Sequence, residues 1–234
     1  MKTKILIIGL VIAALLSACA PTNEKNPRTV HVNGTGMVNI KPDIAYINLG
    51  VHTEGATAAG AVAENNANSQ KLVDTLKAAG VAEADIRTTN FSIYPSQQTD
   101  PQTGKPIGTT YMVDNSVYVT IRDLGKLGEI LDASVKAGAN SINSIQFDKY
   151  DKSADLSQAR EAAVKNAQTQ AQELAKAAGV TLGDVQTIST YDSTPVPLSS
   201  DVKYGLGAAP AAAVPVNPGT LQLTVTVSMV YFIK

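Results

Sequence analysis

Two histidines, His31 and His52, are the only imidazole groups in this 234-residue chain. Imidazole is the most frequent general base in catalysis and a common metal ligand. Neither histidine is close in sequence to a usable nucleophile, because the single cysteine, Cys19, has another role described below. No serine stands in the strand-to-helix turn G-x-S-x-G. The sequence therefore indicates no catalytic residues, and we expect a protein that is not an enzyme and uses no cofactor.

The two histidines could still meet across a pair of strands. In the hairpin predicted below, His31 and His52 lie opposite each other on the face away from the core, about 4.5 to 5.5 Å apart. A shared metal ion is one interpretation, although no third ligand is evident and Glu54 is only a guess. The other interpretation, which we favour, is an ordinary solvated or interfacial pair.

Gly34 and Gly36 have the spacing of glycines in nucleotide-binding loops, but they lie inside a strand pattern and open no helix. We interpret them as positions where another part of the chain packs closely. Asp43 follows Pro42 and is most simply a turn residue.

The N-terminus carries a secretion signal that ends at Cys19. Two lysines precede an apolar run of about 12 residues, too short to span a bilayer, and small residues follow it. Leu16-Ser17-Ala18-Cys19 resembles the bacterial lipobox, which implies cleavage before Cys19 and acylation of its sulfur and amine. We predict a signal peptide at 1–18, then the lipidated Cys19 and a flexible tether to residue 29. Ala20 favours sorting to the outer membrane.

Composition narrows the function further. The formal net charge is −1 and no basic run follows the signal, so a nucleic-acid partner is not expected. With one cysteine, no intrachain disulfide can form. About 216 residues remain after cleavage, enough for one large domain or two small lobes.

Residues 30–40 and 44–51 both alternate apolar and polar side chains, with the apolar set at even positions in the first and at odd positions in the second. This pattern predicts a hairpin that turns at Lys41-Pro42 and pairs residues whose numbers sum to 83. Its outer face would carry an apolar streak, which makes its members candidate contacts in an oligomer. They are Met37, Ile44 and Tyr46.

The remaining elements follow from periodicity and from glycines that end helices. Helices are predicted at 57–79, 124–137 and 154–178, ending at Gly80, Gly138 and Gly179, and strands at 89–93, 111–121, 142–150, 185–191 and 221–233. Two long Pro-rich loops, 95–109 and 193–219, separate strands and are candidate contact segments. The core is expected to contain Val32, Leu49, Val51, Leu72, Leu76, Phe91, Val117, Val119, Phe147, Leu174, Val225 and Val227.

An internal repeat links the two halves. Lys77-Ala78-Ala79-Gly80-Val81 recurs as Lys176-Ala177-Ala178-Gly179-Val180, with strand, helix and loop in the same order around it. We therefore predict an α+β fold made of two related β-α-β-β units, about 30–123 and 140–234, with long helices packed on antiparallel or mixed sheets and joined by a short helix.

Several segments together resemble the SIMPL-domain family. They include VHVNGTGMVNIKPDIAYINLGV, YMVDNSVYVTIRD and AREAAVKNAQTQAQELAKAAGVTLGDV, and the likeness runs from about residue 30 to 233. The resemblance implies an envelope protein of the bacterial periplasmic immunogenic type, linked loosely to oxidative-stress tolerance, with relatives that build ring or channel-like assemblies. It supplies no catalytic residues, and the lipobox makes this a lipoprotein version.

Two functions remain open. The first is a non-enzymatic, self-associating scaffold or binding protein, held by its lipid on the outer membrane and facing the periplasm. The second is a periplasmic binding module for a small or hydrophobic ligand in the gap between the repeats. No sequence feature identifies a protein partner other than a further copy of the chain.

Overall fold

The computed structural model describes residues 27–198 and 216–234, and these form two four-stranded antiparallel sheets with helices on one face of each. The strands are β1 (Thr29–Ile40), β2 (Ile44–Gly55), β3 (Ile86–Thr99), β4 (Pro106–Ile121), β5 (Ser141–Asp148), β6 (Leu182–Asp192), β7 (Val196–Pro197) and β8 (Leu221–Ile233). The α-helices are α2 (Ala58–Ala78), α3 (Leu127–Ala137) and α4 (Ser153–Ala178), and short 3-10 turns precede β3 (Glu83–Asp85) and α3 (Leu124–Lys126). This confirms the predicted α+β class.

The predicted hairpin between the first two strands is wrong. Instead of turning back at Lys41-Pro42, the chain runs on, so that β1 pairs with β8 in one sheet and β2 pairs with β4 and β5 in the other. Asp43 holds this crossing: its N–H donates to the carbonyl of Asp148 at 3.0 Å, and its carboxylate accepts the N–H of Tyr150 at 2.7 Å. The three-residue link shifts the buried side chains from even to odd positions, just as a hairpin turn would. The alternation of apolar and polar residues therefore could not distinguish the two arrangements.

Two strands therefore belong to different sheets from those predicted. The first sheet has the order β3-β4-β2-β5 and is covered by α2, and the second has β1-β8-β6, with the short β7 also paired to β8, and is covered by α4. Strand β1 joins the second unit and β5 joins the first, contrary to the predicted boundaries at 30–123 and 140–234. Nor does α3 join the units, because its apolar face belongs to the core of the first sheet.

The repeat is visible in the local geometry. After α2 the N–H of Val81 donates to the carbonyl of Leu76, and after α4 the N–H of Val180 donates to Ala175, both at 3.0 Å. These are equivalent bonds of a glycine-terminated helix end. Both helices then lead to an edge strand, β3 in one unit and β6 in the other.

The hydrophobic core is divided between the two units. The first is packed with branched side chains from α2, α3, β2 and β4, whereas the fully buried residues of α4 under the second sheet are all alanines, with Leu156 and Val164 partly buried beside them. Of the predicted core residues, nine are buried: Val32, Leu49, Val51, Leu72, Leu76, Val117, Val119, Val225 and Val227. Phe147 is partly buried against the first core. Phe91 and Leu174 are about half exposed, at 50% and 49%, so their prediction is wrong.

Gly34 and Gly36 do mark a close approach, as predicted, but to α4 rather than to β2. A Cβ atom on Gly34 would lie 2.0 Å from the carbonyl oxygen of Ala163, and one on Gly36 would lie 1.9 Å from that of Ala159. Because the strand has glycines here and the facing helix residues are alanines, the backbones of β1 and α4 come into direct contact.

The predicted loop 95–109 is mostly strand. Strands β3 and β4 pair as far as Thr99 and Pro106, and Asp100 closes the turn by accepting the N–H groups of Gln102 and Thr103 at 2.8 and 3.0 Å. In the other predicted loop, 193–219, residues 196–197 form β7, and 199–215 lie outside the described residues.

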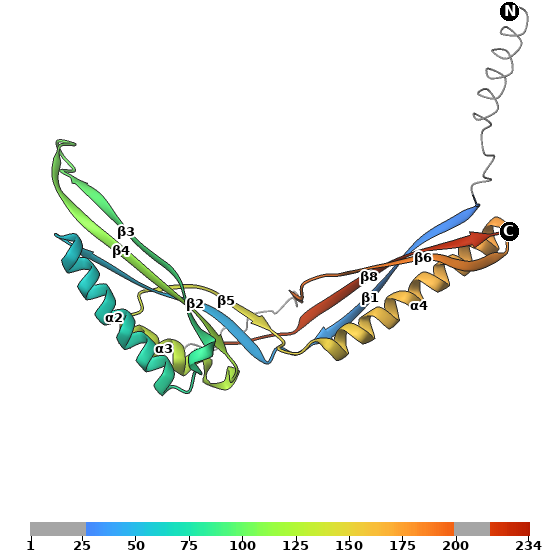
Figure 1. Cartoon of the computed structure of the whole chain (residues 1–234), viewed down its shortest axis with the longest axis horizontal. Coiled ribbons are helices and arrows are strands. Elements are labelled where there is room, and N and C mark those ends of the chain that lie inside the picture. The colour runs from blue at the N-terminus through green and yellow to red at the C-terminus, as the bar shows by residue number, and fades with distance from the viewer. Residues whose placement is uncertain (1–26, 199–215) are drawn as a thin grey trace, which may run out of the picture.

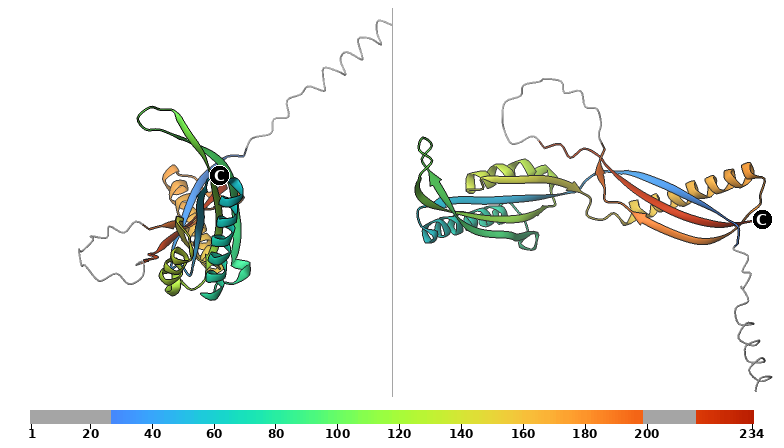
Figure 2. Two further views of the ribbon diagram at one scale, coloured as in Figure 1. Left: turned by 90° about the vertical axis from the view of Figure 1, so that its left-hand side faces the viewer. Right: turned by 90° about the horizontal axis from the view of Figure 1, so that it is seen from above.

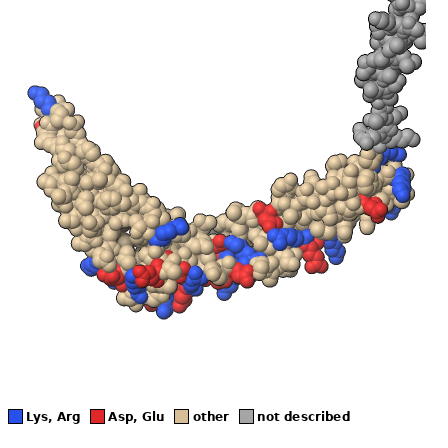
Figure 3. All heavy atoms as spheres, viewed as in Figure 1, with Lys and Arg blue, Asp and Glu red and all other residues tan. Residues whose placement is uncertain are grey.

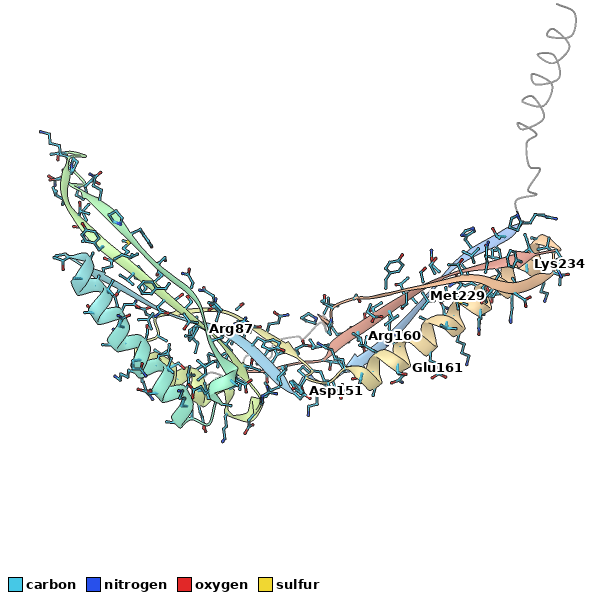
Figure 4. All side chains as sticks on the ribbon, in the orientation of Figure 1. Arg87, Asp151, Arg160, Glu161, Met229 and Lys234 are labelled. Atoms are coloured by element: carbon cyan, nitrogen blue, oxygen red, sulfur yellow. The ribbon has the colours of Figure 1, made fainter. Side chains whose placement is uncertain are left out.

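The two units follow one another along a curved, elongated body (Figures 1 and 2). The helices lie on its convex side, and the opposite faces of both sheets line the concave side. The start of β1 and the C-terminal end lie together at one tip, and the β3–β4 turn lies at the other. Lys234 marks the first tip and Asp151 the junction between the units (Figure 4). None of the helices in the described part of the chain is long and apolar enough to cross a membrane.

Candidate functional site

The structure places His31 and His52 in different sheets, so the predicted histidine pair does not exist. His31 pairs with Val230 in the second sheet and is exposed, whereas His52 pairs with Asp114 in the first. Within residues 27–198 and 216–234, no group of three His, Cys, Asp or Glu side chains could hold a metal ion. Cys19 lies outside the described residues, and its lipidation stays a prediction.

His52 instead belongs to a chain of polar side chains that crosses the open face of the first sheet. Its Nδ1 lies 2.7 Å from Oδ1 of Asp114 on β4, and its Nε2 lies 3.4 Å from Oε1 of Glu54 on its own strand. On the next strand, β3, the hydroxyl of Tyr94 donates to the second oxygen of Asp114 at 3.2 Å. Three neighbouring strands thus contribute to the site.

The backbone of His52 is fixed by a residue 88 positions away. The side-chain amide of Asn140, just after α3, accepts the N–H of His52 at 2.8 Å and donates to its carbonyl at 2.7 Å. These two hydrogen bonds take the place of strand pairing at the point where β5 begins, because β5 pairs with β2 only as far as Gly50. The imidazole therefore projects from a held section of strand.

Electrostatics follows from these contacts. The hydrogen bond that His52 donates to Asp114 raises the pKa of His52 above its ordinary value of 6.5, and Glu54 adds to this, while partial burial opposes it. The same carboxylate raises the pKa of the Tyr94 hydroxyl above 10.0. Asp114 is thus the shared acceptor of the group.

The candidate oligomer contacts do not form one streak. Met37 is exposed on the open face of the second sheet, whereas Ile44 is buried, contrary to the expected outer streak. Tyr46 lies half-buried on the open face of the first sheet, stacked on Tyr118 with ring centroids 5.5 Å apart. The predicted pairing of Met37 with Tyr46 is therefore wrong, and a contact role for these residues stays a prediction.

Among the described residues, the side chains that strand pairing places on the open face of the second sheet include no Lys, Arg, Asp or Glu. Alternate residues of β8 are buried against α4, so the residues between them, with their partners on β1 and β6, form the opposite face. They are Thr29, His31, Asn33, Thr35, Met37, Asn39, Thr187, Ser189, Tyr191, Gln222, Thr224, Thr226, Ser228, Val230 and Phe232. In Figure 3 the charged atoms gather along the convex side and near the tips, and the concave side is largely free of them.

The edges of the sheets differ in how they are protected. On β1 the side chain of Asn166 accepts the N–H of Thr35 at 3.0 Å, and β5 is short, with a bulge opposite β2 and a positive φ at Ser144. Strands β3 and β6 are longer than β5, and both expose large apolar side chains. These are Phe91, Ile93 and Tyr94 on β3 and Val185, Ile188 and Tyr191 on β6.

Comparison with known proteins now places the chain. The model of the SIMPL family, described as a protein of unknown function (DUF541), matches residues 30–231. The chain belongs to the SIMPL family. The 26 kDa periplasmic immunogenic protein of Brucella melitensis is 35% identical over 237 residues, which cover 97% of this chain and 94% of the relative. YggE of Escherichia coli K12, named an uncharacterized protein, is 32% identical over 215 residues, covering 91% and 86%.

These relatives agree with the expected fold family and support a location in the periplasm or cell envelope. Their names give no enzymatic activity. The residues that sequence reasoning missed in this SIMPL protein are Asp114, Tyr94 and Asn140. Each lies far from His52 in sequence, and no local motif marks them.

Proposed function

We propose that this SIMPL protein is a non-enzymatic, lipid-anchored protein of the cell envelope that assembles with copies of itself through the free edges of its two sheets. The observation that carries the proposal is the pair of unprotected edge strands, β3 and β6. A long edge strand with apolar side chains presents unpaired N–H and C=O groups that favour pairing with another chain.

The two edges occupy equivalent positions in the two units but lie far apart in the elongated body (Figure 1). Pairing β3 of one copy with β6 of the next is therefore a heterologous contact. Such contacts generate a closed ring when the rotation between copies closes, and a filament when it does not. A ring is the outcome we expect for a protein that functions as a defined scaffold.

The open sheet faces support such an assembly. Protein interfaces are depleted in charged residues at their centre, and the second sheet offers an uncharged face beside β6. Met37, exposed at 59%, is the largest apolar side chain that β1 contributes to this face. It is thus a candidate contact of the assembly.

The anchor fits the layout of the body. The tether from Cys19 would lead into β1 at the tip that also carries Arg28 and Lys234, whose backbones bond to Ile233 and Thr181. The β3–β4 hairpin would then point away from the outer membrane into the periplasm (Figure 1). A Cys19→Ser protein should leave the membrane fraction in a carbonate wash, and retention there would contradict the anchor.

The family resemblance adds a role in oxidative-stress tolerance, which we assign to the assembly rather than to chemistry at a site. In this proposal the protein contributes as a structural component of the envelope, and its loss acts through the missing assembly. A variant that folds but does not assemble should therefore behave as the deletion does in a peroxide survival assay.

The test of assembly is a charged substitution on one free edge. Ile188→Lys in β6, 56% exposed, should lower the mass measured by size-exclusion chromatography with light scattering, because a lysine on an edge opposes strand addition. Val135→Lys in α3 is the matched control, since that side chain is equally exposed, at 54%, but lies on no edge. A wild-type monomer, or equal masses for both variants, would refute the proposal.

One observation favours a second function. A cavity of about 370 Å³ lies at the junction of the units, lined among others by Ile145, Phe147, Pro197, Leu198 and Leu221. This volume suits a small apolar ligand. A monomeric protein whose binding of a hydrophobic fluorescent probe falls in Phe147→Ala would support a ligand-binding module.

A further inference from the structure

We propose that the groove between α2 and the edge strand β3 binds a neutral sugar that carries an acetamido group, such as an N-acetylhexosamine unit of a glycan. The groove has a volume of about 260 Å³ and lies on the side of the first sheet that α2 covers. The side chains that line it include Asn66, Gln70, Val73, Thr88, Asn115 and Val117. The inference rests on these side chains and does not depend on the assembly proposed above.

The chemistry of the lining selects a neutral, polar ligand. Amides, hydroxyls and valines line the groove, and no charged side chain is among them. A charged ligand would lose its hydration here without gaining a counter-charge, which is costly. A ligand with several hydroxyl or amide groups would instead find a hydrogen-bond partner for each.

Asn66 is a polar residue without a structural reason for its place in α2. Asparagine is a poor helix former, yet α2 contains three within four positions. Asn65 donates to carbonyls of β2 and β4, and Asn68 packs against Gly138 at the end of α3. Asn66 is exposed at the groove, and its amide has no hydrogen-bond partner among the described residues. Its amide is therefore free to bind a ligand.

Asn115 presents the strongest sign of a missing partner. It alternates on β4 with the buried Val113 and Val117, so it faces α2. Its amide oxygen is buried and accepts no hydrogen bond within the described residues, whereas buried polar groups in proteins are almost always paired. The last side-chain torsion of asparagine has a broad range, so a small rotation presents this oxygen to the groove. There it would accept an N–H from the ligand.

An acetamido group matches the base of the groove. It combines an N–H donor, a carbonyl acceptor and a methyl group. The oxygen of Asn115 would accept the N–H, while Val73 and Val117, partly and fully buried, offer an apolar surface to the methyl group. A plain hydroxyl group would satisfy Asn115 but leave the valines in contact with water.

The rest of a sugar ring fits the rim of the groove. Phe91 lies directly opposite Asn115 on β3 and is 50% exposed, so its ring offers an apolar surface to the C–H face of a sugar. The amide of Asn66 and the hydroxyl of Thr88 are available to the ring hydroxyls. Cavities for drug-sized ligands measure about 300 to 1,000 Å³, so this smaller groove suits a single sugar unit.

The experiment uses the full chain with Cys19→Ser and adds tri-N-acetylchitotriose. Cellotriose is the control ligand, because it has the same linked rings without acetamido groups. Binding is measured by calorimetry and by saturation-transfer NMR, which tolerates an assembled protein. One bound sugar unit should give a dissociation constant of about 1 mM, from the usual affinity per non-hydrogen atom. Cellotriose should bind at least fivefold more weakly.

Asn115→Leu, which keeps the shape and removes the amide, should weaken chitotriose binding about fivefold, as the loss of one hydrogen bond predicts. Asn48→Leu is the matched control, because Asn48 also has a buried, unpaired amide oxygen but lies on the open face of the same sheet, opposite Tyr118. Ile188→Lys, in the other sheet, should leave the affinity unchanged, which separates this proposal from the assembly.

Circular dichroism of each variant checks folding, and the exposed Asn66→Ala supplies an independent loss of affinity if Asn115→Leu fails to fold. Equal chitotriose affinity in the Asn115→Leu and Asn48→Leu proteins would overturn the proposal, as would equal affinity for the two sugars. If neither sugar binds, the groove is only the space beside a free strand edge, and the proposal fails.

Discussion

Replacing Gly34 with alanine tests the packing of α4 on the second sheet. The added Cβ would lie 2.0 Å from the carbonyl oxygen of Ala163 and 2.5 Å from the backbone nitrogen of Ala167. Both obstacles are backbone atoms, so no side-chain rotation can relieve the overlap. Since carbon–oxygen contacts need about 3.3 Å, the helix must retreat by about 1.3 Å.

The cost follows from the gap that this retreat opens. The buried alanines of α4, from Ala159 to Ala175, cover about 24 Å of helix, and the helix is about 10 Å wide. A uniform 1.3 Å gap would then create about 300 Å³, equivalent to roughly 7 kcal/mol at about 24 cal/mol per Å³. A helix that pivots about its C-terminal end opens about half that volume, so we expect about 3 to 4 kcal/mol of destabilisation.

The measurement is urea unfolding followed by circular dichroism at 222 nm. With a slope of about 2 kcal/mol per molar urea, the midpoint should fall by about 1.5 to 2 M. Gly108→Ala is the matched control: Gly108 also lies in a strand, but its added Cβ meets no atom within 4 Å. The control should change stability by less than about 1 kcal/mol. A loss below about 1 kcal/mol in Gly34→Ala would refute the close-packing argument.

Three further predictions concern other parts of the protein. Asn65→Ala should lower the free energy of unfolding by about 2 to 4 kcal/mol, because the buried amide of Asn65 donates to carbonyls of both β2 and β4 at 2.8 and 3.1 Å. Asn66→Ala, at an exposed position, is the control, and equal urea midpoints for the two variants would contradict the role of Asn65. Leu76→Ala should lower the free energy of unfolding by about 2 to 5 kcal/mol, and Phe91→Ala should lower it clearly less, since Leu76 is buried and Phe91 lies on a free edge. The reverse order of urea midpoints would contradict this prediction. The hydrogen bond to Asp114 should make His52 titrate above 6.5, so its stabilising contribution is fully present below that pH and lost as the pH rises through the folded value. An NMR titration midpoint at or below 6.5 would contradict the last prediction.

The sequence predicted the elements well where local chemistry determines them. Helix ends at Gly138 and Gly179 follow from the left-handed conformation of these residues. The final strand is found at Leu221–Ile233, where strict alternation placed it. In both cases the signal lies within one element and needs no partner.

The topology could not be obtained in the same way. The change of parity at Lys41-Pro42 fits a hairpin and a straight crossing equally well, and only the identity of the pairing strand separates them. That strand is β8, whose partner residues lie about 190 positions away from β1. Phe91 shows the same limit, because its alternation is that of a core strand but β3 lies at the edge of its sheet.

The candidate site was only half predictable for a related reason. His52 and Glu54 are two residues apart on one strand, so the sequence placed them on one face. Asp114 reaches His52 only through the pairing of β2 with β4, and Asn140 reaches it only from the end of α3. Because β1 and β5 lie in each other's expected sheets, the units are tied by two crossings rather than one. The equivalent strands β3 and β6 form the other edge of each sheet whichever way β1 and β5 are assigned, and these are the surfaces through which we propose that copies assemble.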